Sequence, residues 1–223
     1  MPATATMVQR LHFRPATPAD RDAIIALVTS AYRGEASRAG WTTEADLLDG
    51  PRIVPEVLDQ ELARPRSLVL LAEHGEPPDA AAAAPHGEPL DATAPPGAAE
   101  PPRRLVACAQ VCDEAGVGQF GMFAVAPTRQ GAGIGDAVLR ECERIARDDW
   151  GLPRMRMAVI DRREELIAWY GRRGYRRTGE SRPFPYGDAR FGRPKCDDLR
   201  FAVLEKALAT AANPSPQDGG SAR

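Results

Sequence analysis

The chain has 223 residues, with 29 lysines and arginines against 31 aspartates and glutamates, which gives a formal charge of −2 at pH 7. This near-neutral balance gives no support to a nucleic acid as a partner. No apolar run approaches the roughly 20 residues that a membrane-spanning helix needs, and the N-terminus lacks the basic start and apolar centre of a signal peptide. We therefore expect a cytoplasmic protein with no membrane partner.

The N-terminal part predicts a short strand followed by two helical stretches. The strand begins near Leu11. Thr17 is suited to cap the first helix, with Pro18 at its first position. An apolar stripe with helical spacing follows at Ile24, Leu27, Val28 and Ala31. The second helical stretch is expected over Thr43–Leu62, with a break near Gly50–Pro51.

An Ala/Pro-rich segment, Glu76–Pro102, separates two predicted strands. Eight of its 27 residues are proline and nine are alanine, so it cannot bury enough apolar surface to offset the entropy of ordering it. Ser67–Glu73 and Arg104–Val111 on either side predict a hairpin with an oversized connection. We interpret the segment as a disordered insertion in one domain. A linker between two domains is the weaker alternative, because only about 75 residues precede it.

The C-terminal half alternates predicted strands and helices. Gly118–Ala126 is a near-continuous apolar run, as expected for a strand that is covered on both faces. A helix is predicted over Ile134–Asp148 and a strand over Arg154–Ile160. Together with the antiparallel hairpin, this alternation predicts a mixed α/β sheet.

Two further elements close the chain. Asp161 and Glu164 have the D-x-x-E spacing of a capping box, which would open a helix that Gly174 closes. Leu199–Leu208 predicts a last strand. The tail from residue 211 is rich in small and polar residues and is expected to be disordered.

The cysteines do not predict a metal site. The chain has four of them and only three histidines, and Cys108, Cys112, Cys142 and Cys196 form no CxxC pair, so no metal ligation is expected. Cys108 and Cys112 would lie about 13 Å apart on one strand face, too far for a disulfide. We expect buried, reduced thiols.

Three glycines, Gly131, Gly133 and Gly135, lie between a predicted strand and a predicted helix. The first N–H groups of a helix lack intrahelical partners and carry a partial positive charge. Residues without Cβ atoms there let a phosphate approach closely. The alternative is a tight turn that favours glycine for its backbone freedom. Asp136 stands where a P-loop has lysine, and the glycine spacing does not fit the dinucleotide fingerprint.

The pattern Gln130-x-x-Gly133-x-Gly135 resembles the acyl-CoA signature of the GCN5-related N-acetyltransferase (GNAT) superfamily. The segments GMFAVAPTRQ, Gly121–Gln130, and LIAWYGRRGY, Leu166–Tyr175, are also similar to that superfamily. The resemblance implies a single domain over 11–210 with an insertion at 76–102, an extension at 1–10 and a tail at 211–223. The implied fold is a central mixed sheet of six to seven strands, with helices on both faces and a splayed central pair of strands.

The resemblance also implies where acetyl-CoA would bind as co-substrate. The backbone of a central strand would pair with the pantetheine arm, and the glycine loop would hold the diphosphate through its N–H groups. The strand positions are Phe123, Ala124 and Val125. The loop positions are Gln130, Gly131, Ala132, Gly133, Ile134, Gly135 and Asp136.

Tyr170 matches the helix tyrosine that the family often uses as the general acid toward the CoA sulfur; the alternative is that it only packs. No base is assigned, because Gln119 lies near the position where many relatives carry a glutamate. Arg163 stands where the family often has an asparagine. Three carboxylates at predicted strand ends are weak candidates, since each is more simply explained as a solvated charge: Glu73, Asp113 and Glu114.

An aromatic pocket for a small amine is predicted from Trp41 and Tyr186. The alternative is that Phe184, Tyr186 and Phe191 pin the long loop Ser181–Asp198 onto the core. Four cations of this loop would instead favour an acceptor that carries a carboxylate: Arg182, Arg190, Arg193 and Lys195.

The predicted function is transfer of an acetyl group from acetyl-CoA to a primary amine of a small molecule, by direct attack in a complex of both substrates. The alternative is an acyl-CoA-binding or regulatory module without transferase activity, which Gln119 keeps open. A module that recruits partners through the Ala/Pro segment has little support, because no PxxP motif lies beside basic residues. We expect a monomer or a homodimer.

Overall fold

The computed structural model describes residues 11–75 and 103–208. The expected N-terminal extension, the Ala/Pro insertion and the C-terminal tail lie outside the described residues. The strands are β1 Leu11–Pro15, β2 Leu48–Asp49, β3 Ser67–Gly75, β4 Arg103–Glu114, β5 Val117–Val125, β6 Arg154–Ile160, β7 Arg176–Pro183, β8 Arg193–Pro194 and β9 Arg200–Ala207. The helices are α2 Arg21–Tyr32, α3 Gly34–Ser37, α4 Pro55–Ala63, α5 Ile134–Arg144 and α6 Glu164–Gly171, and a π-helical turn, Ile145–Asp149, extends α5.

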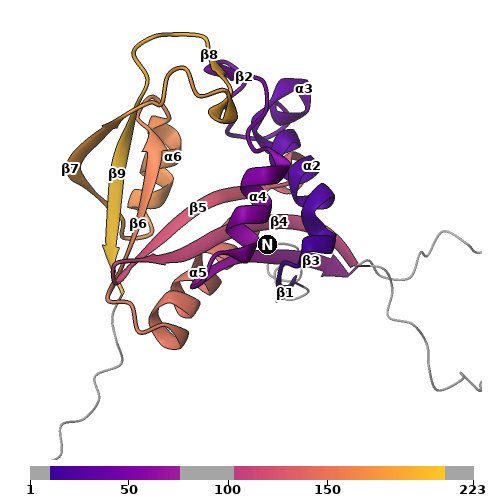
Figure 1. Ribbon diagram of the computed structural model, residues 1–223, viewed down its shortest axis with the longest axis vertical. Helices are drawn as coiled ribbons and strands as arrows, with labels where there is room; N and C mark the ends of the chain where they lie inside the picture. Colours follow the sequence, from indigo (N-terminus) through magenta and orange to yellow (C-terminus); the bar gives the residue numbers. More distant parts are fainter. Residues whose placement is uncertain (1–10, 76–102, 209–223) are drawn as a thin grey trace, which may run out of the picture.

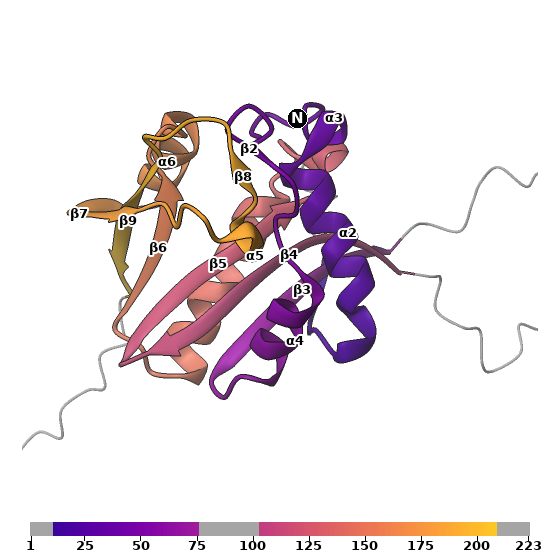
Figure 2. The same cartoon turned by 45° about the horizontal axis from the view of Figure 1, so that its top comes forward.

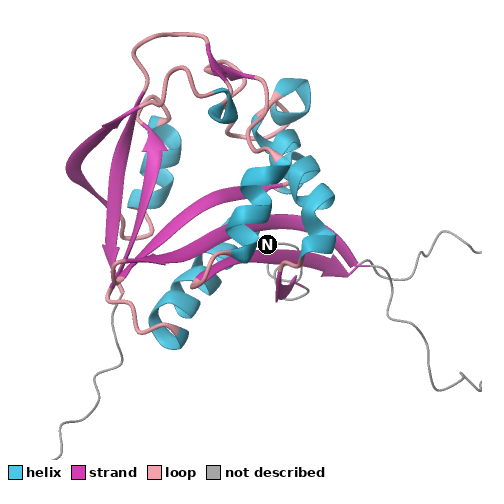
Figure 3. Cartoon of the chain, in the orientation of Figure 1, coloured by secondary structure: helices cyan, strands magenta, loops and turns pink. Residues whose placement is uncertain are grey.

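Seven of these strands form one mixed sheet in the order β1-β3-β4-β5-β6-β9-β7 (Figures 1 and 3). Neighbours are antiparallel except β5 and β6, which run parallel. The predicted hairpin is present as β3 and β4, with Ser67 opposite Cys112. The predicted mixed α/β sheet of six to seven strands is confirmed. β2 and β8 form a separate pair that joins two distant loops.

The central pair of strands, β5 and β6, diverges. They pair only at Gly118 with Met155 and at Gln119 with Arg156, and beyond these residues they separate toward the top of Figure 1. Just after the last pair, β5 carries a bulge at Met122, whose φ is +43°. Because sheet pairing with β6 stops at Gln119, the following edge of β5 is open to other partners.

Helices cover both faces of the sheet. α2 and α4 lie in front of it in Figure 2 and α5 lies behind it. Alternate residues of β3 supply the two cores. Val69 and Leu71 belong to the core that α2 and α4 cover, whereas Leu70 belongs to the core that α5 covers. No helix of the described ranges is long and apolar enough to cross a membrane.

Local signals at the first helix are confirmed. Thr17 precedes a 3-10 turn that begins at Pro18 and leads into α2, and the Thr17 backbone N–H donates to the Asp20 carboxylate at 2.8 Å. The predicted stripe is buried at all four positions: Ile24, Leu27, Val28 and Ala31. All four cysteines are free thiols and three of them are buried, as predicted; Cys196 is half-buried.

The predicted helix over Thr43–Leu62 is wrong in its first half. Residues 45–47 form a turn, Leu48–Asp49 is strand β2, and helix begins only at Pro55. Leu48 pairs with Pro194, a contact so distant in the sequence that no local pattern reports it. Proline at position 55 has no N–H to donate, so it favours the first position of a helix over its interior.

The predicted capping box at Asp161 is also wrong. α6 begins at Glu164, and its N-cap is Arg163, whose φ of −89° and ψ of +59° are not helical. The Asp161 N–H donates to the carbonyl of Arg200 on β9 at 2.9 Å, so this residue completes the β6–β9 pairing instead of capping the helix. α6 ends at Gly171, and Gly174 follows in the left-handed region with a φ of +92°.

Candidate active site

The glycine loop opens helix α5 at the end of β5. Gly131 and Gly133 have φ values of +81° and +82°, and Gly133 is the N-cap of the helix. These left-handed conformations favour glycine. A Cβ on Gly131 would meet no atom within 4 Å, whereas a Cβ on Gly135 would lie 3.2 Å from the ring of Phe123. The loop thus combines a tight turn with a backbone that faces open space.

A cavity of about 330 Å³, which we call the large cavity, lies at this helix terminus. Nine of the residues that the sequence predicted line it: Trp41, Phe123, Ala124, Val125, Gln130, Gly131, Gly133, Gly135 and Asp136. Two predicted loop residues do not, since Ile134 is buried in the core and Ala132 packs against that core. Neither Tyr170 nor Tyr186 lines this cavity.

The carboxylate of Asp136, at the first turn of α5, is neutralised by arginines. Its Oδ1 accepts from Arg173 Nε at 2.8 Å, and its Oδ2 pairs with Arg140. Arg173 also stacks on the ring of Trp169, 3.5 Å from the centroid. Arg172 and Arg173 line the large cavity, so a second source of positive charge lies beside the helix terminus.

The open edge of β5 already receives two side-chain hydrogen bonds. The Tyr32 hydroxyl donates to the carbonyl oxygen of Phe123, and Gln130 Nε2 donates to the carbonyl oxygen of Val125 at 3.2 Å. Gln130 Oε1 accepts from the N–H of Trp41 at 3.0 Å, which ties the loop after α3 to the glycine loop. A carbonyl oxygen has two lone pairs, so each of these acceptors retains capacity for one more donor.

A second, smaller cavity of about 60 Å³ lies between the diverging strands. Its walls come from residues 120–123 of β5, residues 157–160 of β6 and the aromatic rings of Tyr170 and Phe201. The two cavities share four wall residues, Tyr32, Phe123, Arg163 and Leu166. They therefore adjoin one another where β5 and β6 part.

Tyr170 is buried, with 4 % of its surface exposed. Its ring packs edge-on against Trp169, Tyr175 and Phe120, with centroids 5.0, 5.8 and 6.4 Å away. Burial raises the pKa of its hydroxyl well above the ordinary value of 10.0. The phenol therefore keeps its proton at neutral pH while it faces the smaller cavity.

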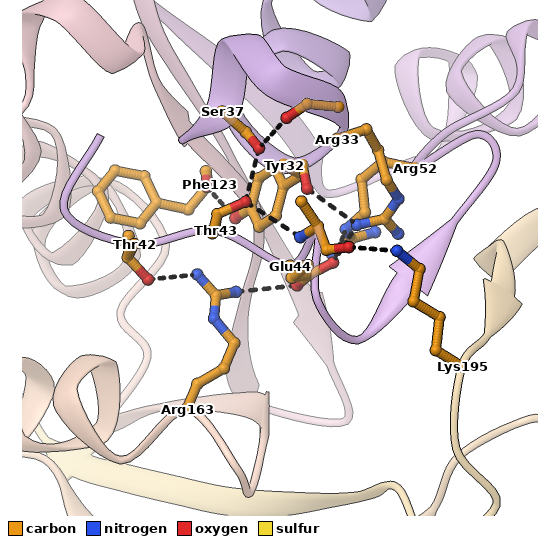
Figure 4. A network of polar contacts seen from close by, with 12 residues as sticks. Tyr32, Arg33, Ser37, Thr42, Thr43, Glu44, Arg52, Phe123, Arg163 and Lys195 are labelled. Atoms are coloured by element: carbon orange, nitrogen blue, oxygen red, sulfur yellow. Dashed lines mark hydrogen bonds and ion pairs between the residues drawn. The ribbon is translucent and has the colours of Figure 1, made fainter. Parts of the chain in front are cut away.

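A cluster of charged side chains surrounds Glu44 (Figure 4). Glu44, Arg52 and Arg163 line the smaller cavity, and Arg163 also lines the large one. Glu44 accepts from Arg33 Nη1 at 2.6 Å and from Arg163 Nη1 at 2.8 Å, and Arg52 Nε lies 3.6 Å from the same carboxylate. Arg163 also donates to the Thr42 hydroxyl at 2.8 Å. Burial alone would raise the pKa of Glu44, but the three guanidinium groups outweigh it and hold that pKa below its ordinary value. We call these three arginines the arginine cluster.

The carboxylates considered as bases lie elsewhere. Each is held in an ion pair outside both cavities: Glu73 with Arg14 at 2.6 Å, Asp113 with Arg66 at 2.6 Å and Glu114 with Arg64 at 3.1 Å. Gln119 is half-buried at the last position where β5 pairs with β6. Among the residues that line the smaller cavity, Glu44 is the only carboxylate.

The loop after β7 lies apart from both cavities. The Tyr186 hydroxyl donates to the Cys196 carbonyl at 3.2 Å and accepts from the Leu199 N–H at 2.7 Å, which favours its role in pinning the loop. Three of the four cations predicted here have carboxylate partners: Arg182 pairs with Glu180, Arg190 with Asp188 and Lys195 with Asp49 of β2. Trp41 lines the large cavity instead, beside the glycines.

Several residues that line the cavities were missed from the sequence. Tyr32 lies in the apolar stripe of α2 and so looked like core, and Arg52 stood inside a predicted helix. Arg172 and Arg173 belong to the segment LIAWYGRRGY, which resembles the family. The available signal was this pair of cations at the end of the predicted helix.

Comparisons with known proteins identify the family of the chain and match its fold. The sequence model of the Acetyltransferase (GNAT) family matches residues 57–175, more than half of the chain. Among solved structures, the chain is similar to the ribosomal-protein-S18-alanine N-acetyltransferase from Escherichia coli, with a TM-score of 0.57, 13 % identity and coverage of 92 % of this chain and 97 % of that one.

Two further solved structures are similar. The IAA acetyltransferase from Bacillus cereus gives a TM-score of 0.55, 13 % identity and coverage of 89 % and 99 %. Nourseothricin acetyltransferase gives 0.55, 16 % and coverage of 90 % and 99 %. No curated protein matches the sequence significantly. The family match and the fold together show that the chain belongs to the GNAT acetyltransferase family.

Proposed function

We propose that the protein is an N-acetyltransferase that transfers an acetyl group from acetyl-CoA to a primary amine of a small molecule. The observation that carries this proposal is the pair of adjoining cavities at the point where β5 and β6 part. One cavity has the features of a coenzyme site, and the other is small and lined in part by the phenol of Tyr170. Two substrates held on either side of one junction would react by proximity, which can lower a barrier by several kcal/mol.

Acetyl-CoA would occupy the large cavity. The diphosphate would accept hydrogen bonds from N–H groups of residues 131–136, at the positive end of the 11-residue helix α5. Arg172 supports this placement by adding positive charge at the same wall, where Arg173 already pairs with Asp136. The pantetheine arm would run along β5 from Val125 to Phe123, as an added strand does at an open sheet edge.

The transfer would proceed by direct attack in a complex of both substrates. The amine nitrogen forms a bond to the thioester carbonyl carbon, the C–S bond breaks, and the electron pair stays on the CoA sulfur. Tyr170 would give that sulfur its proton and regain one from solvent, while the amine releases one proton. No covalent enzyme intermediate is needed, because the thioester is already activated.

The amine must be neutral when it attacks. Glu44 is a weak base because its pKa is lowered by the arginines that hold it. Three arginines against one carboxylate leave two positive charges beside the smaller cavity. Positive charge disfavours the ammonium form of a nearby amine, so this surplus supports deprotonation to water without a dedicated carboxylate.

Replacing the phenol of Tyr170 tests the proposal. We expect Tyr170→Phe to lower kcat about 100-fold, within the range of a lost general acid, with little change in the affinity for CoA. Release of CoA thiol from acetyl-CoA across a panel of amines gives kcat, and calorimetry gives the affinity. Tyr175→Phe is the matched control, because Tyr175 is equally buried and its hydroxyl faces Glu143 and not a cavity.

The alternative function is an acyl-CoA-binding module without transferase activity, which Gln119 on β5 keeps open. CoA binding without amine-dependent thiol release over a broad panel would establish that alternative. If release occurs but Tyr170→Phe is no slower than Tyr175→Phe, the phenol is not the acid.

We further propose a cytoplasmic location and a monomeric or homodimeric enzyme. The location is supported by four free cysteines, three of them buried, since disulfides are rare where thiols are kept reduced.

A further inference from the structure

The arginine cluster carries more positive charge than its protein partner neutralises. Arg33 and Glu44 are 6 % and 4 % exposed, and the Arg163 side chain is 9 % exposed. Arg52, at 30 %, is the most accessible member. Three guanidinium groups against one carboxylate give a net charge of +2 in a largely buried place. Such charges are costly unless a partner of opposite sign compensates them.

The cluster also keeps donors without acceptors. Arg33 Nε, Arg33 Nη2 and Arg163 Nε are buried and have no hydrogen-bond partner. An unsatisfied buried donor is destabilising, and a charged one more so. Arg33 lines neither cavity, whereas Arg163 lines both. A guanidinium group with a free donor beside a cavity is suited to a carboxylate or a phosphate.

The cluster is placed at the acceptor side of the junction. Arg52, Glu44 and Arg163 line the smaller cavity together with Tyr170. Arg163 extends from the start of α6 toward Glu44 and Thr42 (Figure 4). Arg52 and Arg163 both stack on the ring of Tyr32, with their guanidinium carbons 5.0 and 5.4 Å from its centroid. This stacking orients the two groups without using their donors.

We infer that the acceptor amine carries a carboxylate, as a free amino acid does, and that Arg52 and Arg163 bind that carboxylate. The inference rests on the proposed function and names its substrate class. The small volume of the cavity, about 60 Å³, suits the amino-acid end of such a molecule, and the ring of Phe201 and the side chain of Met157 offer it an apolar wall. The carboxylate is thus assigned to arginines of the arginine cluster and not to the cations of the loop after β7.

Matched acceptors test the inference directly. L-alanine and ethylamine differ by one carboxylate, as do L-phenylalanine and 2-phenylethylamine. With saturating acetyl-CoA, we expect kcat/KM for the amino acid of a pair to exceed that for its amine by about 10- to 100-fold, the strength of hydrogen bonds to charged groups. The gain should lie mainly in KM, because the carboxylate binds equally before and during the reaction.

The variant Arg52→Gln tests the assigned residue. Arg52 is the member with the most exposure and the longest distance to Glu44, so its loss disturbs the fold least. We expect this substitution to reduce the ratio of kcat/KM for the amino acid to kcat/KM for its matched amine to about threefold or less, by raising KM for the amino acid. Arg52→Lys should give a ratio between those of the wild type and Arg52→Gln, since lysine keeps the charge but lacks the paired N–H donors of a guanidinium group. Arg21→Gln is the control, because Arg21 is an exposed arginine at the start of α2 that lines neither cavity. It should leave the ratio unchanged.

Two results overturn the inference in distinguishable ways. If the amine of each pair is acetylated as well as its amino acid, the carboxylate is not recognised, although the proposed function stands. If CoA binds and neither member of either pair releases thiol, while other amines also fail, the proposed function fails and the inference with it. Thermal unfolding of each variant shows whether a lost ratio reflects a lost fold.

Discussion

Glu44 is the residue on which the arginine cluster depends. It is 4 % exposed and holds Arg33 and Arg163 at 2.6 and 2.8 Å. Removing one member of a buried ion pair leaves the other charges uncompensated, and this commonly costs about 3–5 kcal/mol. We expect Glu44→Gln to lower the free energy of unfolding by about this amount, measured by urea denaturation. Glu35→Gln, which removes an exposed partner of Arg38, should leave the midpoint unchanged.

The same carboxylate predicts a pH dependence. Its pKa is lowered in the folded protein from an ordinary value of 4.5, so the folded state stays charged where the unfolded chain takes up a proton. The contribution of Glu44 is therefore complete above that ordinary value and is lost as the pH falls through the folded-state pKa. The difference in stability between the wild type and Glu44→Gln should be constant from neutral pH to about 5 and shrink below it. A difference that grows on acidification would contradict this assignment.

The glycines of the loop that joins β5 to α5 permit a left-handed turn and leave open space beside the large cavity. Substitutions can separate these two effects. Gly131 and Gly116 both have φ values near +80° and open space at the Cβ position. Alanine at either position should therefore cost a similar 1–2 kcal/mol of stability, roughly the penalty of a left-handed residue. Only Gly131 lines the large cavity.

We therefore expect Gly131→Ala to weaken CoA binding about tenfold or more, because in the proposed complex its methyl group would lie where the diphosphate approaches. Gly116→Ala should bind CoA as the wild type does. Calorimetry with CoA makes the comparison, and equal affinities for the two variants would show that the glycines serve the turn alone.

Elements with a local signal were predictable from the sequence. The stripe of α2 repeats at helical spacing, and the glycines that open α5 lie within five residues of one another, so both were predicted. β2 was not, because Leu48 finds its partner Pro194 across most of the chain. β7 was missed as a strand of this length because it is exposed at every position and interrupted by Gly179, so it has no alternation to detect.

The same distinction holds for the site. The wall formed by residues 123–136 is continuous in the sequence and was found through its motif. The arginine cluster was not, because Arg33, Glu44 and Arg52 come from one end of the chain and Arg163 from the other. Only the three-dimensional arrangement brings these charges together, and no spacing rule connects them.

At the scale of the whole molecule, the divergence of β5 and β6 divides the sheet into two parts. β1, β3, β4 and β5 form one part and β6, β9 and β7 the other. The cavities adjoin in this opening, and the Arg163–Glu44 pair spans it from the start of α6 to the loop after α3. This is the arrangement on which the proposed reaction of two bound substrates depends.

Initial-rate kinetics test this arrangement most directly. Acetyl-CoA and the acceptor amine with the highest kcat/KM are varied together, and CoA release is measured. If both substrates must be bound at the junction, double-reciprocal plots intersect, and each substrate changes both slope and intercept. Parallel lines would indicate a covalent acetyl-enzyme and departure of CoA before the amine binds, and would contradict direct transfer between the two cavities.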